Sequence, residues 1–401
     1  MPITGSKQIH FLTIKPVSDF IGILKEPGII PLYLSRMGYT SHFASFIDEK
    51  IINEKDELKT FRDSVHVISL KDDRSNPKKL PIASKSILRY IWKEGYKADV
   101  LNLYFLKHSI LYAILYKLLN PHGFLYVKLD LDYTHSFRLE KQWYEPIRRW
   151  LFSLYLRHIP DLVSAETRAA VEYVRQRYMP ATDKLILIPD GIDDELVNQM
   201  VGGGIRPFTE KRNRFMVVGR IGTYHKNTEM MLEAAKLIND WKDWQLHIVG
   251  PIEKAFEGKM KQFYAENPSL KQKVQFFGPI YDRTKLLPMY DEAKVFCMSS
   301  RGESFGLVYG EAQYYGEYIV STPVSSIDDF IENDDDLGRL VYTPQEMAQT
   351  MQEIIDGTKE IESTFEKRVK HGERFRWSTI CKYLDEEIRK RYNHKKEHIV
   401  K

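Results

Sequence analysis

The chain has 401 residues, 43% of them hydrophobic and 28% charged, with a formal net charge of +4. This composition excludes a disordered or fibrous protein, and the length exceeds one typical domain, so we expect two domains that each bury a core. The small net charge gives nucleic-acid binding no support. Two cysteines, no signal-peptide pattern and no apolar stretch that could span a bilayer lead us to expect a protein of the reducing cytosol.

Short apolar, β-branched segments alternate with helical patterns twice along the chain. In the first half we expect strands at 8–14, 65–70, 100–104, 124–129, 162–164 and 185–188. In the second half we expect strands at 215–218, 246–249, 274–277, 294–298, 318–321 and 339–341. Strands that alternate with helices form parallel sheets. The predicted fold class is therefore α/β, with two Rossmann-like domains.

A cluster of glycine and proline marks the boundary between the two halves. Gly202, Gly203, Gly204 and Pro207 are typical of a linker. We expect an N-terminal domain at 1–200 and a C-terminal domain at 205–374.

Residues 143–158 form an amphipathic run in which aromatic side chains stand beside Arg148, Arg149 and Arg157. One interpretation is contact with an anionic membrane surface that carries a lipid-linked acceptor. The other is an ordinary helix that docks on the first sheet and leaves its basic face in water. Both interpretations stay open at the level of the sequence.

The segment that follows the predicted linker combines a strand, a short loop and a helix start. Residues 215–218 predict the strand, and Asn227 or Thr228 predicts the N-cap of the helix. Arg220 and Lys226 therefore come together at a strand end, beside a helix amino terminus. A planar arginine fork and a lysine point charge are the usual pair for binding a diphosphate. The alternative is that both side chains only face solvent.

Residues 301–311 read RGESFGLVYGE and carry two candidate ligand-binding acids. Glu303 follows a predicted strand, Gly306 lies in the loop, and Glu311 falls one turn into the next helix. In an open α/β sheet, ligands bind at this edge of the strands, and a helix start attracts a phosphate. Two carboxylates beside an anion site suit a neutral group rich in hydroxyls, such as a sugar and a ribose. The alternative is a pair of solvated acids.

No spaced cluster of His, Cys and Asp has the pattern of a metal site. Asp334, Asp335 and Asp336 are adjacent, so they cannot all face one ion without a tight turn. We therefore expect a solvated loop there and no metal site.

These motifs resemble those of retaining glycosyltransferases of family 4, which have the GT-B fold. The resemblance is carried by Gly219-Arg220…Lys226, by the Glu303-x7-Glu311 pattern, by 188–193 (IPDGID) and by 375–378 (FRWS). They span roughly the second half of the chain. In the first half, 26–34 is similar to the family's glycine loop and first helix. Asp130, with Lys128 two residues earlier, stands where many members end a strand in histidine.

The resemblance implies a GT-B enzyme that transfers a sugar, of hexosyl type, from a nucleoside diphosphate such as UDP or GDP to an acceptor hydroxyl, with retention of configuration. It implies Arg220, Lys226, Glu303 and Asp130 as the catalytic set. The implied donor-binding set is Gly28, Gly219, Gly278, Ile280, Tyr281, Ser304, Phe305, Gly306, Leu307, Val308 and Glu311.

Within these sets the resemblance implies separate roles. The two cations would neutralise the leaving diphosphate in place of a metal, Glu303 would hold the donor sugar, and Glu311 would hold the ribose. The loop 278–281 would receive the base, the Gly28 loop would close over the phosphates, and Asp130 would approach the acceptor. The closing helix, 375–395, would pack back on the first domain.

The partners implied are a nucleotide-sugar donor and a glycan, lipid-linked or protein-linked acceptor, with no nucleic acid and no cofactor. The setting would be polysaccharide, glycolipid or glycoprotein synthesis. We expect a cytoplasmic location, with peripheral attachment to the inner face of the membrane as the option that 143–158 leaves open.

Three alternatives share part of this pattern. A sugar-nucleotide epimerase of the same fold would need no acceptor. A non-catalytic, nucleotide-binding partner subunit is disfavoured because both acids and both cations are present. A nicotinamide dehydrogenase is disfavoured because Gly219 and Gly222 do not complete a G-x-G-x-x-G fingerprint.

Overall fold

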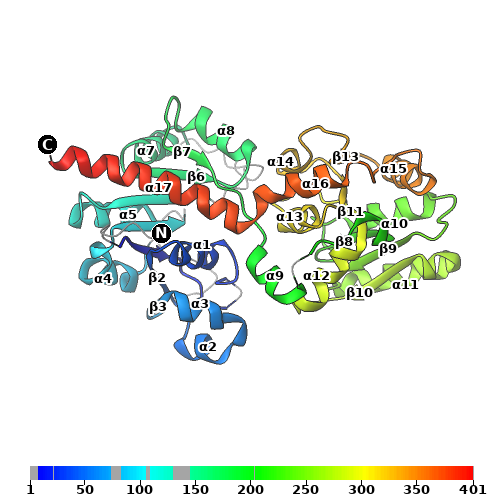
Figure 1. Cartoon of the computed structure of the whole chain (residues 1–401), viewed down its shortest axis with the longest axis horizontal. Helices are drawn as coiled ribbons and strands as arrows, with labels where there is room; N and C mark the ends of the chain where they lie inside the picture. Colours follow the sequence, from blue (N-terminus) through cyan, green and yellow to red (C-terminus); the bar gives the residue numbers. More distant parts are fainter. Residues whose placement is uncertain are drawn as a thin grey trace. The chain divides into compact units, whose positions relative to one another are not determined.

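The structure is a computed structural model and describes residues 8–20, 22–73, 83–104, 109–129, 145–202 and 204–400. It divides into two compact units. The first comprises Met1–Pro189 and Trp377–Lys401, and the second comprises Asp190–Arg376. Each unit contains one parallel sheet with helices on both faces (Figure 1).

The sheet of the first unit has seven strands in the order β3-β2-β1-β4-β5-β6-β7, and each pair of neighbouring strands is parallel. The strands are β1 (His10–Ile14), β2 (Thr40–Ser45), β3 (His66–Ser69), β4 (Val100–Tyr104), β5 (Phe124–Leu129), β6 (Leu162–Ala165) and β7 (Leu185–Leu187). Every residue of β4 and β5 is buried. This is the pattern of central strands that are covered on both faces, and the prediction of a parallel α/β sheet is confirmed.

Helices cover both faces of this sheet. They are α1 (Glu26–Arg36), α2 (Glu49–Glu54), α3 (Lys59–Ser64), α4 (Lys85–Lys93), α5 (Ser109–Leu119), α7 (Glu145–His158), α8 (Arg168–Arg177) and α17 (Trp377–Val400). One core layer joins α1, α3 and α17 to the sheet, and the other joins α4, α5, α7 and α8 to its opposite face. The predicted closing helix therefore packs in the first unit, where α17 contacts α1.

The sheet of the second unit has six parallel strands in the order β10-β9-β8-β11-β12-β13. The strands are β8 (Arg212–Val218), β9 (Gln245–Val249), β10 (Val274–Gly278), β11 (Ala293–Met298), β12 (Tyr318–Ser321) and β13 (Gly338–Leu340). Because β9 and β10 extend on one side of β8 and β11 to β13 on the other, the strand order reverses between β8 and β11. All six predicted strands are present within a few residues of their expected bounds.

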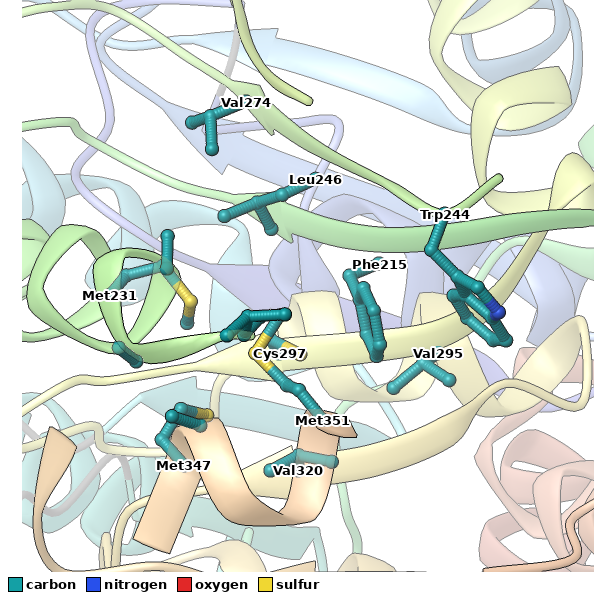
Figure 2. Close-up of a cluster of buried hydrophobic side chains, with 14 of the residues drawn as sticks. Phe215, Met231, Trp244, Leu246, Val274, Val295, Cys297, Val320, Met347 and Met351 are labelled. Carbon is teal, nitrogen blue, oxygen red and sulfur yellow. The ribbon is translucent and has the colours of Figure 1, made fainter. Parts of the chain in front are cut away.

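The helices of the second unit are α9 (Asp194–Val201), α10 (Thr228–Leu237), α11 (Glu257–Glu266), α12 (Arg283–Glu292), α13 (Leu307–Tyr314), α14 (Ile327–Ile331), α15 (Pro344–Asp356) and α16 (Phe365–Gly372). Figure 2 shows the core layer on one face of this sheet, in which Phe215 and Trp244 lie with ring centroids 4.6 Å apart. Met347 and Met351 of α15 close the same layer. A second layer includes Phe296, Tyr309 and Phe330 on the opposite face.

The boundary between the units differs from the predicted linker. The second unit begins at Asp190, because α9 contacts α12 and Ile192 pairs with Arg376. Gly202 instead ends α9, with the left-handed φ of 77° that favours glycine.

Candidate functional site

Most of the predicted site residues of the second unit follow β8 or β11, the two strands between which the sheet order reverses. β8 and β11 are parallel neighbours, and the segments that leave their carboxyl ends run to α10 and α13. In open α/β sheets this reversal point is where ligands bind. A small cavity of about 10 Å³ lies there, lined by residues that include Gly219, Lys226 and Ser300.

A close backbone approach shapes the turn after β8. The N–H of Gly219 donates to the carbonyl of Val249 at 3.0 Å, and Gly250 adopts a φ of 144°. A Cβ atom at Gly250 would lie 1.8 Å from the carbonyl oxygen of Gly219. Only glycine fits there, so the sequence fixes the path of the backbone just before Arg220.

Hydrogen bonds hold Lys226 in place at the end of this turn. Its N–H donates to the hydroxyl of Thr223 at 3.3 Å, and the hydroxyl of Ser299, after β11, donates to the carbonyls of Lys226 and Asn227. Asn227 is the N-cap of α10, as predicted, with a left-handed φ of 49°. The backbone of Lys226 is therefore fastened to both strands.

The Lys226 side chain reaches across to the loop after β11. Its Nζ atom lies 2.5 Å from Oε1 of Glu303, and the two side chains are 21% and 14% exposed. The structure thus brings two of the predicted catalytic residues into direct contact. Arg220 lies at the start of the same turn, where its side chain is exposed and forms no ion pair with any described residue.

A third cation stands at this edge. The guanidinium of Arg301 donates to the carbonyl of Tyr224 at 2.6 Å and lies 4.5 Å from the centre of the Tyr224 ring. The N–H of Arg301 donates to the carbonyl of His225. Arg301 therefore ties the two loops together and adds positive charge. Its position two residues before Glu303 was the signal in the sequence that could have identified Arg301 as a site residue.

The start of α13 faces the same edge of the sheet. Gly306 is its N-cap, with a φ of 79°, and a Cβ atom there would lie 2.8 Å from the Tyr309 ring. Leu307 and Val308 are the first two helical residues, whose N–H groups have no acceptor one turn earlier in the helix. These N–H groups and the helix dipole favour an anion.

The residues before this helix start have divided roles. The Ser325 hydroxyl donates to the carbonyl of Glu303, which braces the loop. Ser304 is exposed, whereas Phe305 is buried 5.2 Å from Phe330, measured between ring centroids. The predicted contact of Phe305 with a donor can therefore come only from its backbone.

Glu311 is held by a residue that the sequence analysis missed. The guanidinium of Arg283, at the start of α12, lies 2.5 Å from Oε1 of Glu311. Burial lowers the pKa of Arg283, but the adjacent Glu311 carboxylate raises it, and the net shift is upward. Arg283 and Glu311 are 36% and 12% exposed, so the pair stays accessible to a ligand.

The loop predicted to receive a base leaves the carboxyl end of β10. Gly278 has a left-handed φ of 67°, and its carbonyl accepts from the N–H of Gly250 at 2.8 Å. Ile280 is half-buried and Tyr281 is 80% exposed. Arg283 begins α12 two residues after Tyr281, so this loop and the Glu311 carboxylate are linked through α12.

Two predicted residues belong to the first unit. Gly28 lies in the first turn of α1 and not in a loop, which corrects the prediction of a glycine loop at that position. The helix begins at Glu26 because Pro27 suits a first turn, and a Cβ at Gly28 would lie 2.1 Å from the carbonyl oxygen of Ile23. Asp130 lies outside the described residues. Lys128 is buried, and its ammonium donates to the carbonyl of Ile188.

The acidic triplet forms ion pairs. Lys367 lies 2.7 Å from both Asp334 and Asp336, and Asp335 pairs with Arg339 and Lys359. In the part of the chain that the structure describes, no group of three His, Cys, Asp or Glu side chains could hold a metal ion.

Part of the second unit is similar in sequence to known sugar-transferring proteins. Residues 212–357 match a family model described as "Glycosyl transferases group 1". This range contains Arg220, Lys226, Glu303 and Glu311. The expectation of a glycosyltransferase agrees with this match.

A relative in sequence covers more of the chain. It is 24% identical over 332 residues, which are 77% of this chain and 76% of the relative, and is named "D-inositol 3-phosphate glycosyltransferase" from Corynebacterium urealyticum. A second relative of the same name, from Corynebacterium aurimucosum, is 24% identical over 235 residues, or 55% of this chain and 53% of the relative.

Solved structures share the whole fold. A glycosyltransferase from Rickettsia africae superposes with a TM-score of 0.69 at 15% identity, covering 96% of this chain and 99% of that one. Anabaena Alr3699/HepE, crystallised with UDP and glucose, gives a TM-score of 0.65 at 16% identity, covering 96% and 100%. The predicted α/β GT-B fold is thereby confirmed.

None of the described helices is both long enough and apolar enough to cross a membrane.

Proposed function

We propose that this chain is a retaining glycosyltransferase that moves a sugar from a nucleoside-diphosphate donor to an acceptor hydroxyl. The observation that carries the proposal is the Lys226–Glu303 contact at the point where the sheet order reverses. It joins a cation for a phosphate to a carboxylate for hydroxyl groups, beside the start of α13. The family match over 212–357 supports the same reaction class.

The donor would bind along this edge with its charges matched. Arg220, Lys226 and the N–H groups of Leu307 and Val308 would neutralise the diphosphate as it leaves. Glu303 would accept hydrogen bonds from sugar hydroxyls, and Glu311 would accept them from the ribose. The loop 278–281 would contact the base.

In our proposal the acceptor oxygen forms its bond to the anomeric carbon on the face from which the diphosphate departs. The bond from that carbon to the phosphate oxygen breaks, and this oxygen takes the acceptor's proton. No protein base is then required, and the product keeps the donor's anomeric configuration. Proton NMR of early product reads this directly, and an inverted product would contradict the retaining assignment.

The acceptor would be a glycan, a lipid-linked or a protein-linked hydroxyl. Because the relatives are named D-inositol 3-phosphate glycosyltransferases, inositol phosphates are the first soluble acceptors to test.

A thermal-shift screen against nucleoside diphosphates and their sugars tests the proposal. A true donor should stabilise the fold by about 2.7 kcal/mol at a hundred times its dissociation constant. The donor found is then incubated with candidate acceptors. Transfer supports the proposal, whereas release of only an isomerised sugar nucleotide would favour an epimerase.

A further inference from the structure

Two helices of the first unit, α5 and α7, expose large apolar side chains on the face that points away from the core. On α5, the outward residues Leu111, Ile114 and Leu118 are 44%, 38% and 73% exposed. Their spacing of three and four residues places them on one stripe. Tyr112 and Tyr116 of the same helix are buried in the core. A surface helix normally turns charged side chains outward, so α5 is unusual.

Helix α7 repeats this pattern. Ile147, Trp150 and Leu151 are 59%, 60% and 55% exposed, while Tyr155 and Leu156 are buried. The helix docks on the first sheet, and Arg149 and Arg157 are exposed beside these apolar side chains. Its outward face therefore combines large apolar side chains with cations.

These helices lie on the same face of the sheet. α4, α5 and α7 all contribute to one core layer, and α4 contacts α5. Trp92 of α4 is 62% exposed. Seven of the fifteen large hydrophobic side chains found exposed among the described residues are on these three helices, so the exposure is concentrated on one face. We call these seven side chains the apolar face.

The charges on the same helices are mostly positive. Together α4, α5 and α7 carry seven Lys and Arg residues and one acidic residue, Glu145, although the whole chain is nearly balanced. Lys117 of α5 is occupied by Asp161, at 2.5 Å. The exposed cations Arg89, Lys93 and Arg149 lie on α4 and α7, whereas α5 carries no fully exposed cation.

We infer that the apolar face docks on an anionic lipid bilayer. Exposed Leu and Ile would enter the boundary between headgroups and acyl chains, Trp92 and Trp150 would lie at the headgroup level, and the cations would contact acidic headgroups. The 11 residues of α5 make about 16 Å of helix, too short to span a bilayer. The helix would therefore lie in the plane of the surface.

This inference concerns the first unit and does not rest on the proposed transferase activity. The full chain is mixed with vesicles of phosphatidylcholine alone or with three-tenths phosphatidylglycerol, and binding is measured by flotation. We expect binding to the anionic vesicles only. Replacing Arg89 and Arg149 with Gln should weaken it by about fivefold for each residue.

The decisive variant replaces Leu111, Ile114 and Leu118 with Gln, a good helix former that keeps the helix intact. We expect at least a tenfold loss of vesicle binding with unchanged thermal unfolding. The matched control is Leu237→Gln, at a 46% exposed position of α10 in the second unit, which should bind as the parent does.

Tryptophan fluorescence locates the contact. Among the tryptophans that the structure describes, Trp92 and Trp150 are exposed, whereas Trp241, Trp244 and Trp377 are buried. Brominated lipids should quench the parent strongly and a Trp92→Phe, Trp150→Phe variant weakly. Four results would overturn the inference: no flotation, equal binding to neutral vesicles, undiminished binding of the Gln variant, or a dimer that the Gln variant abolishes.

Discussion

Lys226 and Glu303 join the two strands between which the sheet of the second unit reverses, with 2.5 Å between Nζ and Oε1. Each side chain neutralises the other while both remain partly exposed, so the pair is held ready without a buried unpaired charge. The Ser299 hydroxyl and the Ser325 hydroxyl brace the backbone on the two sides of the contact. In the proposed reaction the cation meets the diphosphate and the carboxylate meets the sugar.

Glu303 and Glu311 should contribute to the binding of different parts of the donor. If Glu311 binds the ribose, Glu311→Gln should weaken a free nucleoside diphosphate and its sugar alike. Glu303→Gln should leave the free nucleoside diphosphate nearly unaffected and mainly reduce turnover. A lost charge-assisted hydrogen bond corresponds to about 1.5–3 kcal/mol, or roughly ten- to a hundredfold. Calorimetric titration of both variants measures this, and an equal loss of nucleoside diphosphate affinity in both would refute the assignment.

Chelation should leave activity intact. The place where a diphosphate would bind already holds Arg220, Lys226 and a helix start, so a divalent cation would meet like charge. We predict full transfer activity after exhaustive treatment with EDTA, measured once donor and acceptor are known. Activity that disappears on chelation and returns with manganese would overturn this account of the phosphate site.

Stability should fall in mildly acidic solution because of His247 on β9. Burial lowers the pKa of His247 to about 4, helped by the charges of Arg214 and Arg212, whereas an unfolded histidine titrates near 6.5. Between about pH 6.5 and pH 4, His247 is protonated in the unfolded chain but stays neutral in the folded chain. The free energy of unfolding should thus decrease by up to about 3 kcal/mol across that window and be unaffected by this group above it.

Urea unfolding of the parent and of His247→Gln at pH 4.5 to 7.5 tests this prediction. Burial also lowers the pKa of His42, in the first unit, with smaller contributions from His66 and His10, but that effect is common to both proteins. The variant should lose pH dependence relative to the parent. Parallel curves would show that His247 does not titrate as described.

Gly250→Ala should disturb the turn that carries Arg220. The added Cβ would lie 1.8 Å from the carbonyl oxygen of Gly219, so that backbone must move. We expect a destabilisation of about 2 kcal/mol and weaker donor binding. Gly258→Ala in α11, where a Cβ meets nothing within 4 Å, is the control and should cost nothing. The test is thermal unfolding of both variants. Equal unfolding temperatures would contradict the predicted clash between a Cβ at position 250 and the carbonyl of Gly219.

Strands could be predicted from the sequence where all of their residues are buried. β4 and β5 have their predicted bounds because continuous apolar runs mark central strands of parallel sheets. β2 was missed, since TSHFAS is small and polar and reveals its role only by lying between β1 and β3. The prediction of a loop at Gly28 was wrong, because a glycine that permits close packing inside a helix looks the same in sequence as one in a loop.

The candidate site was predictable only in part. Lys226 and Glu303 follow neighbouring strands, so their meeting at one sheet edge follows from topology. Arg283 was missed because its contact with Glu311 depends on how α12 and α13 are oriented, 28 residues apart in the chain. Sequence spacing carries no signal for such a contact.

The central claim is that Arg220 and Lys226 bind the diphosphate of the donor. Calorimetric titration of the nucleoside diphosphate identified by the thermal screen tests it most directly, using the parent and an Arg220→Gln, Lys226→Met variant. The control is Lys259→Met, which removes an exposed lysine paired with Glu229 on the surface of the same unit. We predict parental affinity in the control and at least a hundredfold loss in the double variant, since each charged hydrogen bond contributes roughly 1.5–3 kcal/mol. Unchanged affinity in the double variant would place the phosphates elsewhere and contradict the proposed site.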